Sequence, residues 1–387
     1  MSPKNVIVIG TGVAGASTAF ALARRGVQVS LIDADSQGTA TAAGAGIIQP
    51  WSSSVKGDFY RLYADGAEYY DELIGQLRSV GVDNIAYRRS GALVVNEDPH
   101  VLEEVEARLA ARSSDATSMG EVTRLNNAQA RELFPPLGTG FAAIHIAGGA
   151  RVDGRYLRAG LLAGAQALGA TVIPGTAAIA ETGATGSGNR WTVEVEGRAL
   201  PAEAVVVAAG AWSNQLLEPL GRRIPLEPQR GQITHLRLGK VDTRFWPSVH
   251  PVSSHYMVSF DDSRVVVGAT RESGAGFDPR VTAAGQRQVL DDALAVAPGL
   301  ADATVIETRV GLRPLPDGEM PIVGALSGFD NLYLNTGFGA AGLTMGPLIG
   351  EELAKLIVDE TEAPANGLLS TIHGSESAVA TVQPTHG

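Results

Sequence analysis

The chain has 387 residues and 44% of them are hydrophobic, which is enough for two domains with a large core. A formal net charge of −11 argues against nucleic acid and anionic membrane surfaces as partners. Cysteine is absent, which excludes disulfides, thiolate metal sites, cysteine nucleophiles and a flavin attached through a cysteine thioether.

We also expect no membrane span and no targeting segment. No apolar run approaches the length needed to cross a bilayer, and the residues before the first core strand are too few for a signal peptide. These features predict a soluble, cytoplasmic protein.

The first thirty-three residues predict a βαβ unit. Residues 5–9 are apolar and rich in β-branched side chains, as in a strand that is buried on both faces. A small-residue helix follows and ends before Gly26, and residues 27–32 form a second strand with Asp33 at its end. Between the first strand and the helix lies a glycine-rich turn, Gly10-Thr11-Gly12-Val13-Ala14-Gly15.

This G-x-G-x-x-G turn is typical of dinucleotide binding. Gly10 permits the tight turn, Gly12 lets a pyrophosphate approach the backbone, and Gly15 lets the helix lie close to the strand. The helix N-terminus offers free N–H groups and a partial positive charge to phosphates. Asp33 can accept hydrogen bonds from a ribose 2′-OH, which favours FAD or NAD over NADP. The alternative is a glycine-rich turn in an ordinary α/β domain.

The segment that follows the βαβ unit has no large apolar side chains. Residues 36–46 carry only small or polar side chains before Ile47, so they can lie against a backbone or a flat ligand. The alternative is a flexible loop. Farther on, periodicity predicts helices at 59–80, 101–112 and 128–134, and strands at 87–95, with a bend at Gly91, and at 141–146.

An α/β pattern returns at Gly149. We predict a helix at 156–168, a strand at 170–173, a hairpin around 191–195 and a buried strand at 204–209. Residues 225–307 are instead rich in strands, at 232–238, 256–260 and 264–269, followed by a helix at 283–296. A last strand, 332–335, leads into a second glycine-rich loop, 337–342, and a helix at 345–359.

These patterns predict an α/β fold with two domains. A discontinuous, Rossmann-like dinucleotide-binding domain comprises residues 1–83, 149–224 and 308–373. An inserted, mostly antiparallel β-sheet substrate domain comprises residues 84–148 and 225–307. The small, polar tail, 374–387, is predicted to be disordered.

Three further features could take part in chemistry. The loop 337–342 places a second helix N-terminus where an electron-rich ring, such as a reduced flavin, could be stabilised; the alternative is a tight turn that packs a terminal helix. Arg313, between glycine and proline, can bind a carboxylate through two parallel hydrogen bonds, or it is a solvated surface group. Tyr256 can donate to the same carboxylate, or it is a core aromatic.

Other kinds of active site have little support. The seven histidines show no metal-ligand spacing, so we expect no metal. No Ser/His/Asp order stands out, which gives nucleophilic hydrolysis little support.

Taken together, six segments resemble the FAD-dependent D-amino acid oxidase family, which includes glycine oxidase, sarcosine oxidase and bacterial D-amino acid dehydrogenases. The resemblance covers nearly the whole chain apart from the tail. The segments are VIVIGTGVAGASTAFALARRGVQVSLID (6–33), TAAGAGII (41–48), VVVAAGAWS (205–213), RGQI (230–233), GLRP (311–314) and NTGFGAAGLTMGPLIG (335–350).

The resemblance implies a role for each of these segments. The dinucleotide-binding domain would hold FAD, and Arg313 would pair with the substrate carboxylate with the help of Tyr256, while Ile48 would line the pocket above the flavin. The implied cofactor-binding residues are Gly10, Gly12, Val13, Ala14, Gly15, Asp33, Thr41, Ala45, Gly46, Ile47, Gly210, Trp212, Gly339, Ala340, Gly342, Leu343 and Thr344. Because the chain has no cysteine and residues 39–46 contain no histidine, we expect the FAD to be noncovalent.

The activity implied by the resemblance is oxidation of the C–N bond of a small amino or imino acid, of the D-amino acid, glycine, sarcosine or D-proline type. Hydride would pass to flavin N5, and the imine would hydrolyse to a 2-oxo acid. Oxygen as the electron acceptor would make the protein an oxidase, and a quinone or another acceptor would make it a dehydrogenase.

Two alternatives come from other classes of protein. An NAD-dependent dehydrogenase would use only the N-terminal Rossmann unit, and the second glycine loop and the returning α/β segment argue against it. A flavoprotein without redox turnover would use FAD for structure or for partner binding.

Overall fold

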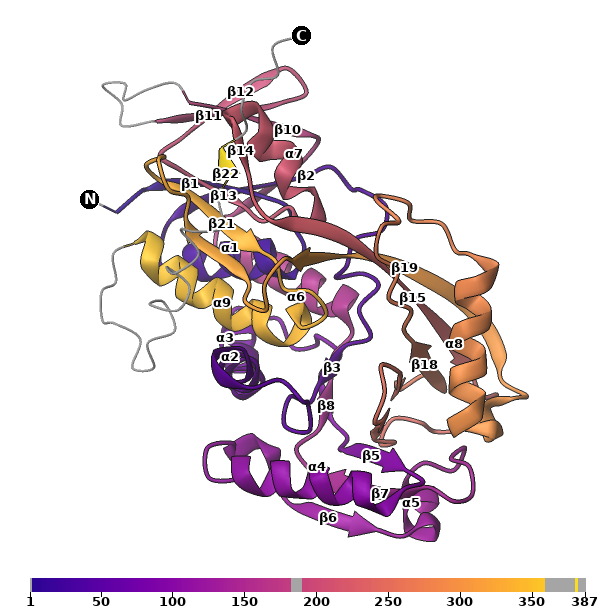
Figure 1. The fold of residues 1–387 in the computed structure, drawn as a ribbon. Helices are drawn as coiled ribbons and strands as arrows, with labels where there is room; N and C mark the ends of the chain where they lie inside the picture. Colours follow the sequence, from indigo (N-terminus) through magenta and orange to yellow (C-terminus); the bar gives the residue numbers. More distant parts are fainter. Residues whose placement is uncertain (1, 182–189, 359–379, 382–387) are drawn as a thin grey trace.

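The computed structural model describes residues 2–181, 190–358 and 380–381. Two large sheets organise the chain (Figure 1). Within the described ranges, no helix is both long enough and apolar enough to cross a membrane.

The first sheet has six strands and is almost entirely parallel. Only β20 runs antiparallel to its neighbour. Its order is β20 (Ile322–Ala325), β21 (Leu332–Thr336), β13 (Ala204–Val207), β1 (Asn5–Ile9), β2 (Gln28–Asp33) and β9 (Thr171–Pro174). The predicted βαβ unit is therefore confirmed, with β1 pairing with both β2 and β13 at the centre of the sheet.

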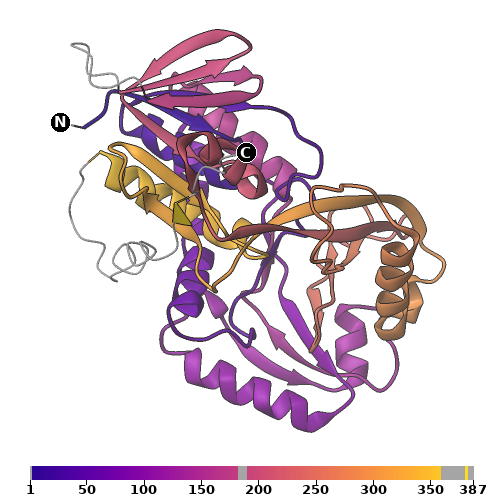
Figure 2. The ribbon, with the colours of Figure 1, turned by 45° about the horizontal axis from the view of Figure 1, so that its top comes forward.

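Both faces of this sheet are covered, which explains the continuous apolar run of β1. Val6 and Val8 face the main core, which the helices α1 (Val13–Arg24), α6 (Gly154–Ala167) and α9 (Gly342–Ile357) share. Ile7 and Ile9 face a second core beneath a three-stranded antiparallel sheet (Figure 2). That sheet consists of β10 (Ala177–Glu181), β11 (Trp191–Val195) and β12 (Arg198–Ala202).

The second sheet has eight strands and is antiparallel except between β16 and β5. Helix α8 (Ala283–Val296) and α5 (Asn127–Leu133) contribute to the core of this sheet. The strand order is β19 (Thr304–Pro316), β15 (Leu226–Arg237), β18 (Arg264–Gly268), β17 (Tyr256–Ser259), β16 (Ser248–Pro251), β5 (Ala92–Asn96), β7 (Ala142–Ile146) and β6 (Val122–Leu125).

Smaller elements join these two sheets. A short sheet of β3 (Ile47–Ile48), β8 (Ala150–Arg151) and β4 (Arg88–Arg89) lies between them (Figure 1). The remaining elements are α2 (Gly57–Glu68), α3 (Tyr70–Ser79), α4 (Pro99–Arg112), α7 (Ser213–Leu217), β14 (Arg222–Arg223), β22 (Ala380–Thr381) and the 3-10 helices η1 (Thr117–Met119), η2 (Gly210–Trp212), η3 (Glu218–Leu220) and η4 (Pro298–Leu300).

The mixed α/β architecture agrees with the predicted fold class, and the largest differences from the predicted helix bounds are at 59–80 and at the start of the last helix. The helix predicted at 59–80 is divided at Tyr69 into α2 and α3, although Tyr69 itself has helical backbone angles, and the buried Tyr70 ring stacks on Tyr87. The last helix begins at Gly342 rather than at 345, so the glycine loop supplies its first turn. Its predicted end at 359 lies outside the described residues.

The predicted domain boundaries stay a prediction. Strand β19, residues 304–316, pairs with β15 along its length and so extends the antiparallel sheet beyond the boundary placed at 307. The predicted disordered tail lies outside the described residues, except that Ala380–Thr381 pair with β14.

Buried His235 on β15 makes the stability of the fold depend on pH. Burial, and then the charges of Arg309 and Arg264, lower its pKa from 6.5 to about 4. The unfolded chain therefore binds more protons than the folded chain between these two pH values.

We expect the free energy of unfolding to fall as the pH drops from 7 to 4, with His235 contributing a loss on the order of 3 kcal/mol. His235→Gln should flatten this dependence in denaturant titrations. His100→Gln should not flatten it, because His100 is exposed and Glu103 raises its pKa rather than lowering it. An unchanged slope in the His235 variant would contradict this account.

Candidate active site

A cavity of about 910 Å³ lies between the two large sheets. Residues that follow β1, β2 and β13 line one end, and side chains from β15, β17 and β19 line the other. The carboxyl ends of parallel strands are the usual place for a ligand in such a sheet.

At the first end, the glycine turn forms a cradle without side chains. Gly10 has a φ of +102°, and a Cβ there would overlap the carbonyl oxygen of Ala208. A Cβ on Gly15 would overlap the carbonyl oxygen of Gly10, so Gly15 lies behind the turn and allows α1 to pack closely. Gly12 lines the cavity, as do Val13 and Ala14. The N-terminus of α1 therefore reaches the cavity with its backbone exposed to a ligand.

The carboxylate of Asp33 also lines this end, and its position is fixed by the backbone. Its Oδ2 accepts from the N–H of Thr11 at 2.7 Å, and its Oδ1 accepts from the N–H of Asp35 at 2.7 Å. Arg158, from α6, lies 3.8 Å from Oδ2. Sequence reasoning missed Arg158, because nothing in the local pattern of α6 marks it as a neighbour of β2.

The segment rich in small residues runs along the middle of the cavity. Thr41, Ala45, Gly46 and Ile47 all line it. The Thr41 hydroxyl accepts from the N–H of Val13 at 2.9 Å and so caps the first turn of α1. A Cβ on Gly46 would overlap the carbonyl oxygen of Val152, so this segment is closely packed against other backbone.

The prediction that Ile48 lines the pocket is wrong. Side chains alternate along strand β3, so Ile47 faces the cavity and Ile48 points into the main core, where it is 1% exposed.

The second glycine loop closes the far side of the cavity. Gly339, Ala340, Gly342 and Leu343 line it, and because α9 begins at Gly342, the N-terminus of this helix lies at the cavity. Thr344 does not line the cavity: it is buried, and its hydroxyl donates to the carbonyl oxygen of Ile47 at 3.0 Å. It therefore acts as a support behind the cavity wall.

Gly210 and Trp212 line the cavity after β13, as predicted from the sequence. The ring of Trp212 lies 5.5 Å, between centroids, from that of Phe277 in the loop after β18. This contact links the wall on the parallel sheet to a loop of the antiparallel sheet.

Arg313 is the central polar group at the antiparallel end. Its Nη1 donates to the carbonyl oxygen of Thr270 at 3.1 Å and to Oε1 of Gln229 at 3.4 Å, and the guanidinium also bonds to the Tyr256 hydroxyl. Burial lowers the pKa of Arg313, and nearby Arg271 lowers it further, but an arginine stays protonated. All three acceptors are neutral, so the positive charge is available to an anion.

Tyr256 lies beside Arg313 with its hydroxyl protonated, because burial raises the pKa of Tyr256. The sequence predicted this pair from two separate segments. Within the described ranges, no group of three or more His, Asp and Glu side chains could hold a metal ion.

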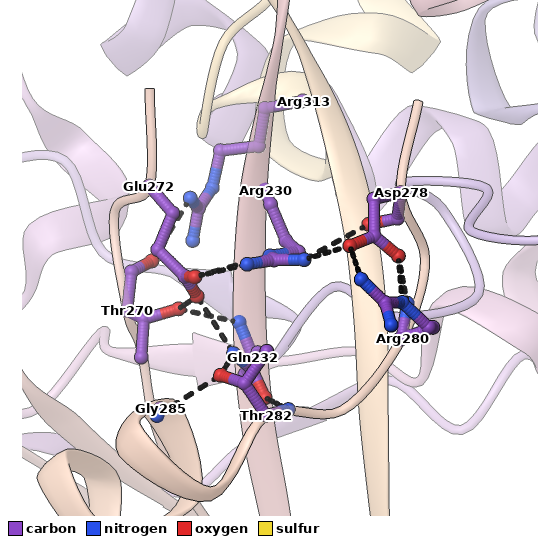
Figure 3. A network of polar contacts seen from close by, with 9 residues as sticks. All are labelled: Arg230, Gln232, Thr270, Glu272, Asp278, Arg280, Thr282, Gly285 and Arg313. Carbon is purple, nitrogen blue, oxygen red and sulfur yellow. Dashed lines mark hydrogen bonds and ion pairs between the residues drawn. The ribbon is translucent and has the colours of Figure 1, made fainter. Parts of the chain in front are cut away.

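A polar network lies beside Arg313 and holds the segment after β18, residues 270–272, against strand β15 (Figure 3). Glu272 accepts from Arg230 at 2.7 Å, from Gln232 at 2.7 Å and from Thr270 at 2.6 Å. Arg230 also donates to Asp278 at 2.8 Å. These contacts fasten the segment after β18 to β15.

Comparison with known proteins identifies the family. A family model described as FAD dependent oxidoreductase matches residues 5–356. The chain belongs to this family, DAO. The family predicted from the sequence is confirmed, and with it the assignment as an FAD-dependent oxidoreductase.

Three relatives illustrate how close this similarity is. The oxidoreductase YurR of Bacillus subtilis is 46% identical over 92% of this chain and 95% of its own length. A glycine oxidase of Pseudomonas putida is 33% identical over 89% of this chain and 92% of its own. The crystal structure of iminodiacetate oxidase from Chelativorans sp. BNC1 superposes with a TM-score of 0.89, at 48% identity, over 93% of this chain and 97% of that one.

The cavity of this DAO-family chain fits an extended dinucleotide. The turn at Gly10 and Gly12 suits a pyrophosphate because these residues line the cavity with backbone alone, and Asp33 suits a ribose hydroxyl. The N-terminus of α9 suits the electron-rich edge of a flavin ring.

Gly231 is a site residue that sequence reasoning quoted only as part of the RGQI segment. A Cβ on Gly231 would lie 2.5 Å from Cζ of Arg313. The missing side chain therefore provides the space that the guanidinium occupies.

We expect Gly231→Ala to displace the Arg313 guanidinium and to weaken binding of carboxylates roughly tenfold, the worth of one charge-assisted hydrogen bond. The measurement is carboxylate binding to the FAD-loaded protein by calorimetry. Gly75→Ala, on α3 with nothing within 4 Å, is the matched control and should bind as the wild type does. Equal affinities in all three proteins would show that Gly231 has no such role.

Proposed function

We propose that the protein oxidises the C–N bond of a small amino or imino acid, of the D-amino acid, glycine, sarcosine or D-proline type. The observation that carries the proposal is the Arg313 guanidinium, which lies in the cavity wall with neutral acceptors only. A guanidinium in that setting binds a carboxylate through two parallel hydrogen bonds.

The names of two relatives support this substrate class. Glycine oxidase and iminodiacetate oxidase each denote oxidation of a small amine that carries a carboxylate. The two names also favour oxygen as the electron acceptor over a quinone.

The cofactor of the proposal is noncovalent FAD. Gly10, Gly12 and Asp33 would hold its ADP half, and the N-terminus of α9 would face the flavin ring. No cysteine exists to tether the ring, and residues 39–46 contain no histidine. When bound, FAD would supply the two-electron oxidant that takes hydride from the carbon bearing the amine; the nitrogen then loses a proton, and water hydrolyses the imine to a 2-oxo acid and ammonia or an amine.

The role of the chain is then to bind and orient the substrate. Arg313 and Tyr256 hold the carboxylate, while apolar Ile47 and Ile233 line the same cavity. Burial lowers the pKa of the cavity-lining His250 to about 4, so this imidazole is neutral at pH 7 and adds no charge beside the amine. The proposed reaction relies on position and on the charge of Arg313, which is the kind of contribution that proteins make to cofactor chemistry.

We expect glycine, sarcosine or a D-amino acid to bleach the flavin absorption of the FAD-loaded protein without air. Arg313→Gln should raise the KM for the reactive amine roughly tenfold to hundredfold, because a charge-assisted contact to the carboxylate is lost. The flavin spectrum should stay as in the wild type.

Arg287→Gln, on the exposed surface of α8, is the control and should leave KM unchanged. Admitting air then separates the acceptors, since fast recovery of the absorption indicates an oxidase and slow recovery a dehydrogenase. A flavin that no carboxylated amine reduces would contradict the proposal and favour a flavoprotein without redox turnover.

A further inference from the structure

We propose that Arg271 binds a second carboxylate, so that the preferred substrate of this site is an amine flanked by two carboxylate groups. The inference rests on the proposed function, because it takes the first carboxylate to lie on Arg313. Sequence reasoning missed Arg271, which follows a strand without any motif around it.

The backbone directs Arg271 into the cavity. After β18 the chain continues beside β15, with the N–H of Glu272 donating to the carbonyl oxygen of Arg230 at 2.9 Å and the reverse bond at 3.0 Å. Thr270 and Glu272 both turn toward the network of Arg230 and Gln232 (Figure 3). Arg271 stands between them in an extended segment, so its side chain points to the opposite face.

That opposite face is the substrate end of the cavity. Arg271, Gly231, Arg313 and Tyr256 all line it. The positive charge of Arg271 is close enough to Arg313 to lower the pKa of Arg313. Two guanidinium groups thus share one wall, and a single carboxylate cannot neutralise both.

Arg271 also has no partner among the residues that the structure describes. Neighbouring arginines are paired, Arg230 with Glu272 and Asp278, and Arg280 with Asp278. Within the described residues Arg271 makes no hydrogen bond and no ion pair.

The adjacent carboxylate is fully engaged elsewhere. One oxygen of Glu272 accepts from Arg230, and the other accepts from Gln232 and Thr270. It therefore cannot fold back to neutralise Arg271. An unpaired cation beside a substrate-binding cation points to an anionic group on the ligand itself.

The test compares iminodiacetate, a secondary amine with two carboxylates, with sarcosine, which replaces one carboxymethyl arm by a methyl group. In the FAD-loaded wild type we expect a lower KM for iminodiacetate. Arg271→Gln should raise that KM at least tenfold and should raise the KM for sarcosine far less. Arg271→Lys, which keeps the charge, should restore part of the affinity for iminodiacetate.

Arg280→Gln is the matched control, because Arg280 lies in the same loop, is 82% exposed and pairs with Asp278. It should change neither KM. Binding without turnover gives a second measurement: glutarate and butyrate are the carbon analogues of iminodiacetate and sarcosine, and calorimetry should show that Arg271→Gln weakens only glutarate.

The outcomes separate the two proposals. If both amines reduce the flavin and Arg271→Gln affects them equally, or affects neither, the second carboxylate site is overturned and the proposed function stands. If neither amine nor any other carboxylated amine reduces the wild-type flavin, the proposed function fails and this inference fails with it.

Discussion

The site depends on the close packing of α1 against α9. A Cβ on Gly350 would lie 2.5 Å from Cβ of Ser17, and one on Gly346 would lie 3.2 Å from Val13. Asn335, at the end of β21, donates to the Thr18 hydroxyl at 2.9 Å and joins the same contact. Because the two helices run side by side in the same direction, both N-termini reach one cavity, and the chain presents two positive helix ends to a single ligand.

The opposite wall of the cavity presents charged side chains instead of helix N-termini. The chain has a net charge of −11, yet two arginines, Arg271 and Arg313, line this wall. The nearby carboxylates pair with other side chains. Glu272 and Asp278 are engaged by Arg230, so they brace the strand and do not neutralise Arg313. This difference between paired and unpaired arginines is the basis on which we propose that the wall binds anions.

Much of this arrangement could be predicted from sequence, because the informative patterns are local. The alternation of β-branched residues, the spacing of Gly10, Gly12 and Gly15, and the acid at Asp33 all lie within one βαβ unit. The errors came where a tertiary contact overrides a local pattern. Ile48 was placed on the wrong face because strand β3 is too short to show its own alternation.

The sequence by itself determined the family and the cofactor class, since both are carried by consecutive residues, and it predicted Arg313 as the arginine that binds a carboxylate. Only the tertiary structure decided which side chains share the cavity. Arg158, on helix α6, lies close to Asp33. Arg230 and Arg280 form ion pairs with carboxylates, whereas Arg271 forms none with any described residue, and the sequence alone does not show this difference. Pairing of charges depends on distances between segments far apart in the chain, and no local pattern encodes those distances.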